Sequence, residues 1–159
     1  MTNFIEVFDN HLLFWSLTAC LIAQLLKIIF NLVSNRELRF GIIFETGGMP
    51  SSHSALITGV TSGIGWDLGF NSSTFALSVC ISLIVMYDAS GIRRSAGLQA
   101  AQINTISKTL DENSLVKLKE TLGHTRSEVI VGAIIGPMVV LPGIVLIGSP
   151  GNIINLFLS

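Results

Sequence analysis

Apolar runs of membrane-spanning length are the feature that most constrains this chain. Charged residues make up only 12% of its 159 residues, about half of their share in an ordinary soluble domain. A helix needs roughly 20 apolar residues to cross a bilayer. Four stretches approach or reach that length, at 11–33, 54–70, 72–88 and 128–148. The sequence therefore predicts an all-α integral membrane bundle with about four transmembrane helices, forming a single domain over residues 1–159.

The charged residues sort by side of the membrane. Segment 34–53 joins the first two predicted spans and segment 89–127 joins the last two, so both segments lie on one face. All nine Lys and Arg residues fall at this face, with Lys27 inside the nearby end of the first span. The positive-inside rule makes this face cytoplasmic. A net charge of −1 leaves no basic field for nucleic acid, so membrane lipid is the expected surrounding partner.

The connecting segment 89–127 carries its own helical pattern. Residues 100–114 are polar and predict a helix that ends in a turn. Beyond it, Leu115, Leu118 and Leu122 recur at i, i+3 and i+7 among charged residues. This spacing is typical of an amphipathic helix at a membrane surface. We therefore expect a cytoplasmic amphipathic connector between the third and fourth spans.

Glycines recur at helical spacing inside two of the predicted spans. The pairs Gly59–Gly63 and Gly132–Gly136 each have the small-xxx-small pattern, which lets two helices approach closely in lipid. Close packing between spans is the interpretation that we favour. Such faces also leave a homodimer open.

Segment 47–54, GGMPSSHS, precedes the second span and has the most unusual composition in the chain. Its glycines, Gly48 among them, permit an irregular backbone, Pro50 fixes φ before the helix, and Ser51 and Ser52 are suited to cap it. His53 then falls in the first turn, where unpaired N–H groups and the helix dipole attract anions. A plain helix cap needs one serine, so the segment predicts an anion-binding site.

Two further polar clusters lie at the same face. Asp88 precedes the pair Arg93 and Arg94 at the end of the third span. These arginines either anchor in anionic lipid headgroups or bind phosphate through bidentate hydrogen bonds, with Asp88 orienting one of them. His124 and Glu128 open the fourth span at i, i+4 and share a helix face. A carboxylate on one imidazole nitrogen leaves the other nitrogen free to react.

Lys27 is the remaining unusual charge, because it lies within an apolar span. Its ammonium either snorkels to the interface or lines a polar pocket with Gln24 and Asn31 on the same helical face. Two imidazoles, several cations and a helix start at one face suggest phosphoryl transfer. One histidine attacks phosphorus, the other protonates the leaving alcohol, and the cations hold the phosphoryl oxygens. The spacing supplies no acidic cluster for Mg²⁺, so we expect no metal and no cofactor.

These segments resemble the divergent branch of the type-2 phosphatidic acid phosphatase family, which is related to acid phosphatases and vanadium haloperoxidases. The resemblance covers almost the whole chain. It is strongest in GGMPSSHSA (47–55), YDASGIRRSAGLQA (87–100) and LGHTRSEVIVG (122–132). These three segments in this order are specific, whereas Pro-Ser-Ser-His alone is a weak signal.

The resemblance implies roles for individual residues. Residues 50–53 match the Pro-Ser-Gly-His motif of the main superfamily, with Ser52 in place of glycine. The match implies that His53 is the general acid and that Ser51 and Ser52, with nearby backbone amides, bind phosphate. His124-x3-Glu128 matches the end of Ser-Arg-x5-His-x3-Asp, which implies that His124 forms a phosphohistidine and that Glu128 orients it.

Two motifs of the superfamily are incomplete here. Ser34 stands where Lys-x6-Arg-Pro, begun at Lys27, has its arginine, and Lys117-Leu118 stands where the third motif has Ser-Arg. We assign phosphate binding to Lys27, Arg93 and Arg94 from their placement at the same face.

The expected function is an integral membrane phosphatase that hydrolyses a lipid phosphate or an isoprenyl (di)phosphate. The alternative is a catalytically inactive membrane protein that binds anionic lipid or a partner through the same pocket. A small transporter is a third hypothesis, which the lack of a second polar stripe disfavours.

Overall fold

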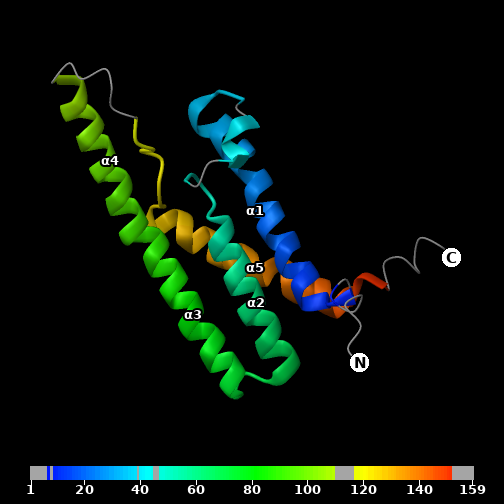
Figure 1. Ribbon diagram of the computed structural model, residues 1–159. Coiled ribbons are helices and arrows are strands. Elements are labelled where there is room, and N and C mark those ends of the chain that lie inside the picture. The colour runs from blue at the N-terminus through cyan, green and yellow to red at the C-terminus, as the bar shows by residue number, and fades with distance from the viewer. Residues whose placement is uncertain (1–6, 8, 39, 45–46, 110–116, 152–159) are drawn as a thin grey trace.

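The chain folds into helices, as Figure 1 shows for the computed structural model. The structure describes residues 7, 9–38, 40–44, 47–109 and 117–151. Over these residues it contains no strand, which confirms the all-α prediction. The helices are α1 (His11–Asn35), the short 3₁₀ helix η2 (Phe40–Phe44), α2 (Ser52–Leu68), α3 (Ser73–Ser90), α4 (Ile92–Thr109) and α5 (Arg126–Leu146).

Three helical stretches are long and apolar enough to cross a membrane. They are α1, the nearly continuous α3 and α4 over Ser73–Thr109, and α5. The remaining predicted span corresponds to α2, which has 17 residues and so a length of about 26 Å. That is shorter than the roughly 30 Å hydrocarbon core. The short helix lies inside the bundle, where it packs against α1, α3 and α5.

Contacts between helix ends fix the direction of each helix. At the start of α1, Trp15 Nε1 donates to the Gly148 carbonyl just beyond α5 at 2.9 Å. The His11 ring contacts the Asp67 carboxylate at the end of α2 at 2.9 Å. At the opposite end of the bundle, the Ser51 amide donates to the Glu128 carbonyl at 3.0 Å. Therefore α2 and α5 run parallel to each other, and α1 runs antiparallel to both.

The glycine pairs bring α2 and α5 into close contact, as predicted. A Cβ added to Gly132 would lie 2.2 Å from the Ser51 carbonyl oxygen, and one added to Gly136 would lie 2.3 Å from Thr58 Oγ1. A Cβ on Gly59 would lie 2.9 Å from a methyl group of Val140. The small residues therefore let the two backbones approach more closely than larger side chains would. These glycine faces are used within one chain.

The connector helix lies earlier in the chain than predicted. It is α4, which begins at Ile92, directly after α3, and ends at Thr109. The predicted residues 110–114 and Leu115 lie outside the described residues. Leu118 and Leu122 belong to residues 117–125, which form no helix. The amphipathic helix predicted from the leucine spacing is therefore wrong for the part of it that the structure describes.

The physical reason lies on α4. The Asn104 side chain accepts from the Leu118 amide at 2.9 Å and donates to the Leu118 carbonyl at 2.8 Å. These bonds satisfy backbone groups that a helix would otherwise pair internally. Two turns nearer the start of α4, a Cβ on Gly97 would lie 2.7 Å from the Leu122 carbonyl oxygen. The segment 117–122 therefore runs along α4 and leads directly to His124.

Candidate active site

The predicted site residues converge at one end of the bundle, where two loops meet. The bond from the Ser51 amide to the Glu128 carbonyl joins the start of α2 to the start of α5. The His124 amide donates to the Ala89 carbonyl at 2.9 Å, which joins the segment before α5 to the end of α3. Main-chain bonds therefore fix three chain segments that are distant in sequence against one another.

His124 is held in one orientation by Glu128. Its ring is 3% exposed, and Nδ1 lies 3.0 Å from Glu128 Oε2. The same oxygen accepts from the Thr125 amide at 3.2 Å, as part of the capping box that begins α5. A carboxylate on Nδ1 favours the tautomer whose proton lies on Nδ1, which leaves a lone pair on Nε2. This is the arrangement expected from the i, i+4 spacing.

The other nitrogen of this ring carries the chemical interest. Among the described residues, His124 Nε2 is buried and has no hydrogen-bond partner. Leaving a buried polar atom unsatisfied costs about 1–3 kcal/mol. The unsatisfied Nε2 atom of His124 is therefore a candidate for contact with a ligand.

The loop before α2 packs tightly against the His124 segment. Gly48 has φ of +89°, a region that favours glycine, and the Met49–Pro50 peptide bond is cis. A Cβ on Gly47 would lie 3.3 Å from the Gly123 carbonyl oxygen. The sequence signal of two glycines therefore marks a close approach between the two loops.

Ser51 and Ser52 are both buried at the start of α2. The Ser51 hydroxyl accepts from the Ser54 amide at 3.3 Å and from the Ser54 hydroxyl at 2.9 Å. This hydroxyl therefore acts as the N-cap of α2. A direct contact of either serine with phosphate stays a prediction.

His53 lies exposed in the first turn of α2. Partial burial lowers the pKa of its ring, and three ionisable groups, Arg93, His124 and Lys27, lower it further. They come from α4, from the segment before α5 and from α1. These groups lie at the same end of the bundle as His53, and direct contact between the two histidines stays a prediction. Lys27 itself is 2% exposed, so its ammonium lies within the bundle and does not snorkel to the surface.

The arginine pair is divided between two environments. Arg93 Nε donates to Asp88 Oδ2 at 2.6 Å, which is the ion pair expected from the sequence. Arg94 lines a cavity together with His124. Gly123 permits this proximity, because its φ is +82° and an added Cβ would lie 2.3 Å from the Arg94 amide nitrogen.

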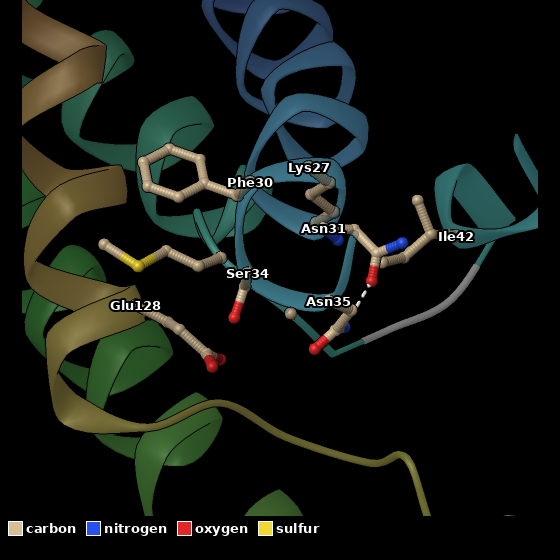
Figure 2. Close-up of a pocket in the computed structure, with 9 residues that line it drawn as sticks. Lys27, Phe30, Asn31, Ser34, Asn35, Ile42 and Glu128 are labelled. Atoms are coloured by element: carbon tan, nitrogen blue, oxygen red, sulfur yellow. Dashed lines mark hydrogen bonds between the residues drawn. The ribbon is translucent and has the colours of Figure 1, made fainter. Parts of the chain in front are cut away.

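Two cavities meet at this site. The smaller, about 260 Å³, is here called the His124 cavity and is lined by residues that include Gly48, Arg94, His124 and Glu128. The larger, about 420 Å³, is called the Lys27 cavity and is shown in Figure 2. Gly48 and Glu128 line both cavities. The polar residues of the Lys27 cavity are Lys27, Asn31, Ser34, Asn35 and Glu128.

Sequence reasoning missed two of the polar residues at or near this site. Asn35 extends the stripe of Lys27 and Asn31 by one turn, at i, i+4 and i+8, so that stripe was a usable signal. Asn104, which holds the segment leading to His124, left no signal within its polar helix. Among the described residues, no group of three or more His, Cys, Asp or Glu side chains is placed to hold a metal ion.

Comparison with known proteins is consistent with this geometry. Residues 8–139 match the family model described as the divergent PAP2 family. The chain is also 37% identical over 150 residues to the uncharacterized membrane protein YuiD of Bacillus subtilis (strain 168), covering 86% of this chain and 95% of that protein. No solved structure matches the chain. The family match covers most of the chain, and the membrane bundle agrees with it. This chain is therefore a member of the divergent PAP2 family.

Proposed function

We propose that this chain is an integral membrane phosphatase that hydrolyses a lipid phosphate or an isoprenyl (di)phosphate. The observation that carries the proposal is the His124 ring, with Glu128 on Nδ1 and a buried, unpartnered Nε2 in a cavity that Arg94 also lines. An oriented imidazole with a free lone pair beside a guanidinium is suited to attack a phosphoryl group.

The proposed reaction has two steps. In the first, His124 Nε2 forms a bond to phosphorus, the bond from phosphorus to the leaving oxygen breaks, and His53 donates a proton to that oxygen. In the second, His53 takes a proton from water, the water oxygen bonds to phosphorus, and the phosphohistidine N–P bond breaks. Glu128 stabilises the positive charge on the His124 ring. The products are inorganic phosphate and the alcohol, or inorganic phosphate and the isoprenyl monophosphate when the substrate is a diphosphate.

Cations and backbone amides surround the proposed phosphoryl position. Lys27, Arg93 and Arg94 supply positive charge, and the start of α2, after Ser51 and Ser52, supplies amide groups and the positive end of a helix dipole. The three cations act on non-bridging oxygens, where negative charge builds up during transfer. Gly48 keeps the loop close enough for this arrangement.

The site is proposed to face the cytoplasm. The nine Lys and Arg residues all lie at the site end of the chain's predicted topology, and this bias orients membrane proteins with that end inside. Labelling of single cysteines introduced at Gln102 and at Asn71 in intact cells tests the orientation. A membrane-impermeant reagent should label position 71 only, and labelling of position 102 would reverse the assignment.

The decisive experiment uses the purified protein in detergent or nanodiscs. Phosphate release is measured from phosphatidate, phosphatidylglycerol phosphate and a polyprenyl diphosphate, and a ³²P-labelled substrate is used to trap the covalent intermediate. His124→Ala should abolish both signals. His11→Ala is the matched control, because His11 also contacts a carboxylate but lies at the other end of the bundle. Phosphate release that survives in His124→Ala would overturn the mechanism.

A non-catalytic lipid-binding protein is the competing candidate. It is favoured by Ser34 and Lys117-Leu118, which stand where the superfamily motifs have arginine residues. This candidate predicts that anionic lipid binds through Lys27 and Arg94 without turnover. A labelled phosphohistidine on His124 would exclude it.

A further inference from the structure

Asn104 is buried in the second half of α4 and uses its whole side-chain amide on one neighbouring segment. Its oxygen accepts from the Leu118 amide at 2.9 Å, and its nitrogen donates to the Leu118 carbonyl and to Glu120 Oε1, both at 2.8 Å. An amide nitrogen has two protons, and these two bonds use both of them. These three bonds are here called the Asn104 clamp. The proposed chemistry gives this residue no role, although its side chain is 6% exposed.

Asn104 belongs to a face of α4 made of small residues. The buried residues of this helix are Gly97, Ala100 and Asn104, which recur at i, i+3 and i+7 and so share one helix face. A Cβ on Gly97 would lie 2.7 Å from the carbonyl oxygens of both Glu120 and Leu122. The face therefore lets the non-helical segment 118–122 lie directly against the helix.

The same pair of helices also contacts the residues that follow this segment. A Cβ on Gly123 would lie 2.3 Å from the Arg94 amide nitrogen, and the His124 amide donates to the Ala89 carbonyl at 2.9 Å. Figure 1 shows that α4 continues α3 in nearly the same direction. Segment 118–124 therefore follows α4 back to the end of α3, with its first contact at the Asn104 clamp and its last at His124.

This segment also forms part of the wall of the His124 cavity. Residues 120–125 all line that cavity, together with Arg94 and Leu98 of α4. A shift of the segment along α4 would therefore move the His124 ring relative to Arg94. Misplacing a reacting group by about 1 Å costs about 10²-fold in rate. The clamp thus acts on a distance to which phosphoryl transfer is sensitive.

We infer that Asn104 is a positioning residue, which aligns His124 with the phosphoryl group by holding segment 118–120 on α4. Its bonds go to residues 118 and 120, so it acts through the segment and not by touching the reacting atoms. The inference rests on the proposed function, since it concerns the alignment of the same nucleophile. The proposed phosphate-binding cations lie on α1 and α4, outside the clamped segment. Loss of the clamp should therefore slow the reaction more than it weakens substrate binding.

Kinetics of the purified full-length protein with a lipid phosphate test the inference at a temperature well below unfolding. Asn104→Ala should lower kcat about 10- to 100-fold and leave KM within about threefold. Asn10→Ala is the matched control, because Asn10 Oδ1 also accepts from a main-chain amide, that of Leu13 at 2.9 Å, but at the other end of the bundle. It should leave kcat within about twofold. An unchanged kcat in Asn104→Ala, or equal losses in both variants, would overturn the inference.

Reversing the polarity of the contact gives a rescue test. Asn104→Asp keeps an acceptor for the Leu118 amide but places a second carboxylate against Glu120, so it should lower kcat at least as much as Asn104→Ala. Adding Glu120→Gln supplies an amide donor to the new carboxylate. The double variant should therefore raise kcat at least about fivefold above that of Asn104→Asp alone, the value of one neutral hydrogen bond. No recovery in the double variant would contradict the clamp.

Hydrogen–deuterium exchange at single-residue resolution makes the test independent of turnover. The His124 amide bonds to Ala89 and not to Asn104, so its exchange reports whether loss of the clamp reaches the proposed nucleophile. We expect Asn104→Ala to speed exchange at this amide at least about tenfold and Asn10→Ala to leave it within about twofold. Unchanged exchange would overturn the positioning role. Faster exchange in Asn104→Ala, in a parent protein that releases no phosphate from any lipid probe, would support the clamp and overturn the proposed phosphatase.

Discussion

Both ends of the bundle carry a histidine paired with a carboxylate, yet the two pairs differ in almost everything else. His124 and Glu128 lie 3.0 Å apart within one helix start, with side-chain exposures of 3% and 18%. His11 and Asp67 lie 2.9 Å apart and join two helices, with exposures of 37% and 29%. The pair alone therefore does not mark a site.

The surroundings supply the difference. The His124 pair lies in a cavity that Arg94 also lines, and its free nitrogen is buried. The cavity beside His11 is lined by Asn10, Leu12, Ile64 and Leu68 besides the pair itself, and none of these described lining residues is a lysine or an arginine. A histidine–carboxylate pair becomes chemically useful where a second imidazole, positive charge and burial accompany it. The predictions below test this comparison, beginning with the largest expected effect.

The largest difference is expected between the two histidines themselves. His124→Ala should lower kcat at least about 10⁴-fold, because it removes the proposed nucleophile. His11→Ala should leave kcat within about threefold, since that ring meets no proposed reacting group. Both are measured as initial rates of phosphate release at saturating substrate. Similar losses of kcat in the two variants would contradict the proposal that only the His124 end of the bundle is an active site.

The two carboxylates give the next contrast. In Glu128→Gln, an amide N–H directed at His124 Nδ1 would favour the wrong tautomer and lower kcat by about 10³-fold. Asp67→Asn should alter only the melting temperature. Rates and thermal unfolding of both variants are compared in the same detergent. A Glu128→Gln enzyme with full activity would show that the carboxylate does not orient the nucleophile.

His53 is expected to contribute less, and in a way that depends on the leaving group. His53→Ala should lower kcat for lipid phosphates by about 10²–10³-fold, which is typical of a lost general acid. The leaving group of p-nitrophenyl phosphate needs no proton. His53→Ala should therefore lower the rate of the first step much less with this substrate. Single-turnover kinetics with both substrates separate the two cases. An identical loss with both would contradict the role as proton donor.

Substituting one glycine at each end of the bundle separates an effect on stability from an effect on the candidate site. Gly132→Ala would push a methyl group toward the Ser51 carbonyl oxygen, 2.2 Å from the added Cβ, and Gly143→Ala would push one toward the Trp15 ring at the same distance. Each should destabilise the fold by about 1–3 kcal/mol through overpacking. Only Gly132→Ala should also change kcat at temperatures well below unfolding, because it shifts the start of α2, which carries His53.

The smallest effect is expected at the Arg93–Asp88 ion pair. With side-chain exposures of 49% and 30%, such a pair contributes about 0.2–1 kcal/mol. Asp88→Asn should therefore lower kcat/KM less than about fivefold, and added salt should shrink the difference from the parent protein. A loss as large as that of His53→Ala would show that Asp88 does more than orient the arginine.

The coarse fold and the meeting of the site residues were predictable because a bilayer forces apolar helices to cross it. Alternate crossings then placed Lys27, His53, Arg93 and His124 at one face, where the structure finds them. The i, i+4 spacing likewise predicted the contact between His124 and Glu128.

The remainder depends on tertiary contacts that no local pattern encodes. The leucine spacing at 115–122 predicted a helix, but Asn104 holds the described part of that segment along α4. The Lys27 cavity is formed by α1, the loop before α2 and Glu128 of α5, so its size follows only from how these elements pack.

The hydrogen bond from the Ser51 amide to the Glu128 carbonyl has a consequence for which residues can stand at these two positions. The Ser51 amide and the Glu128 carbonyl join the start of α2 to the start of α5 through peptide groups alone. Any residue except proline at position 51 supplies the same N–H, and any residue at 128 supplies the same carbonyl. The contact that holds the two histidine-bearing segments together is thus made by main-chain groups. The bond itself therefore places no requirement on either side chain, except that residue 51 is not proline.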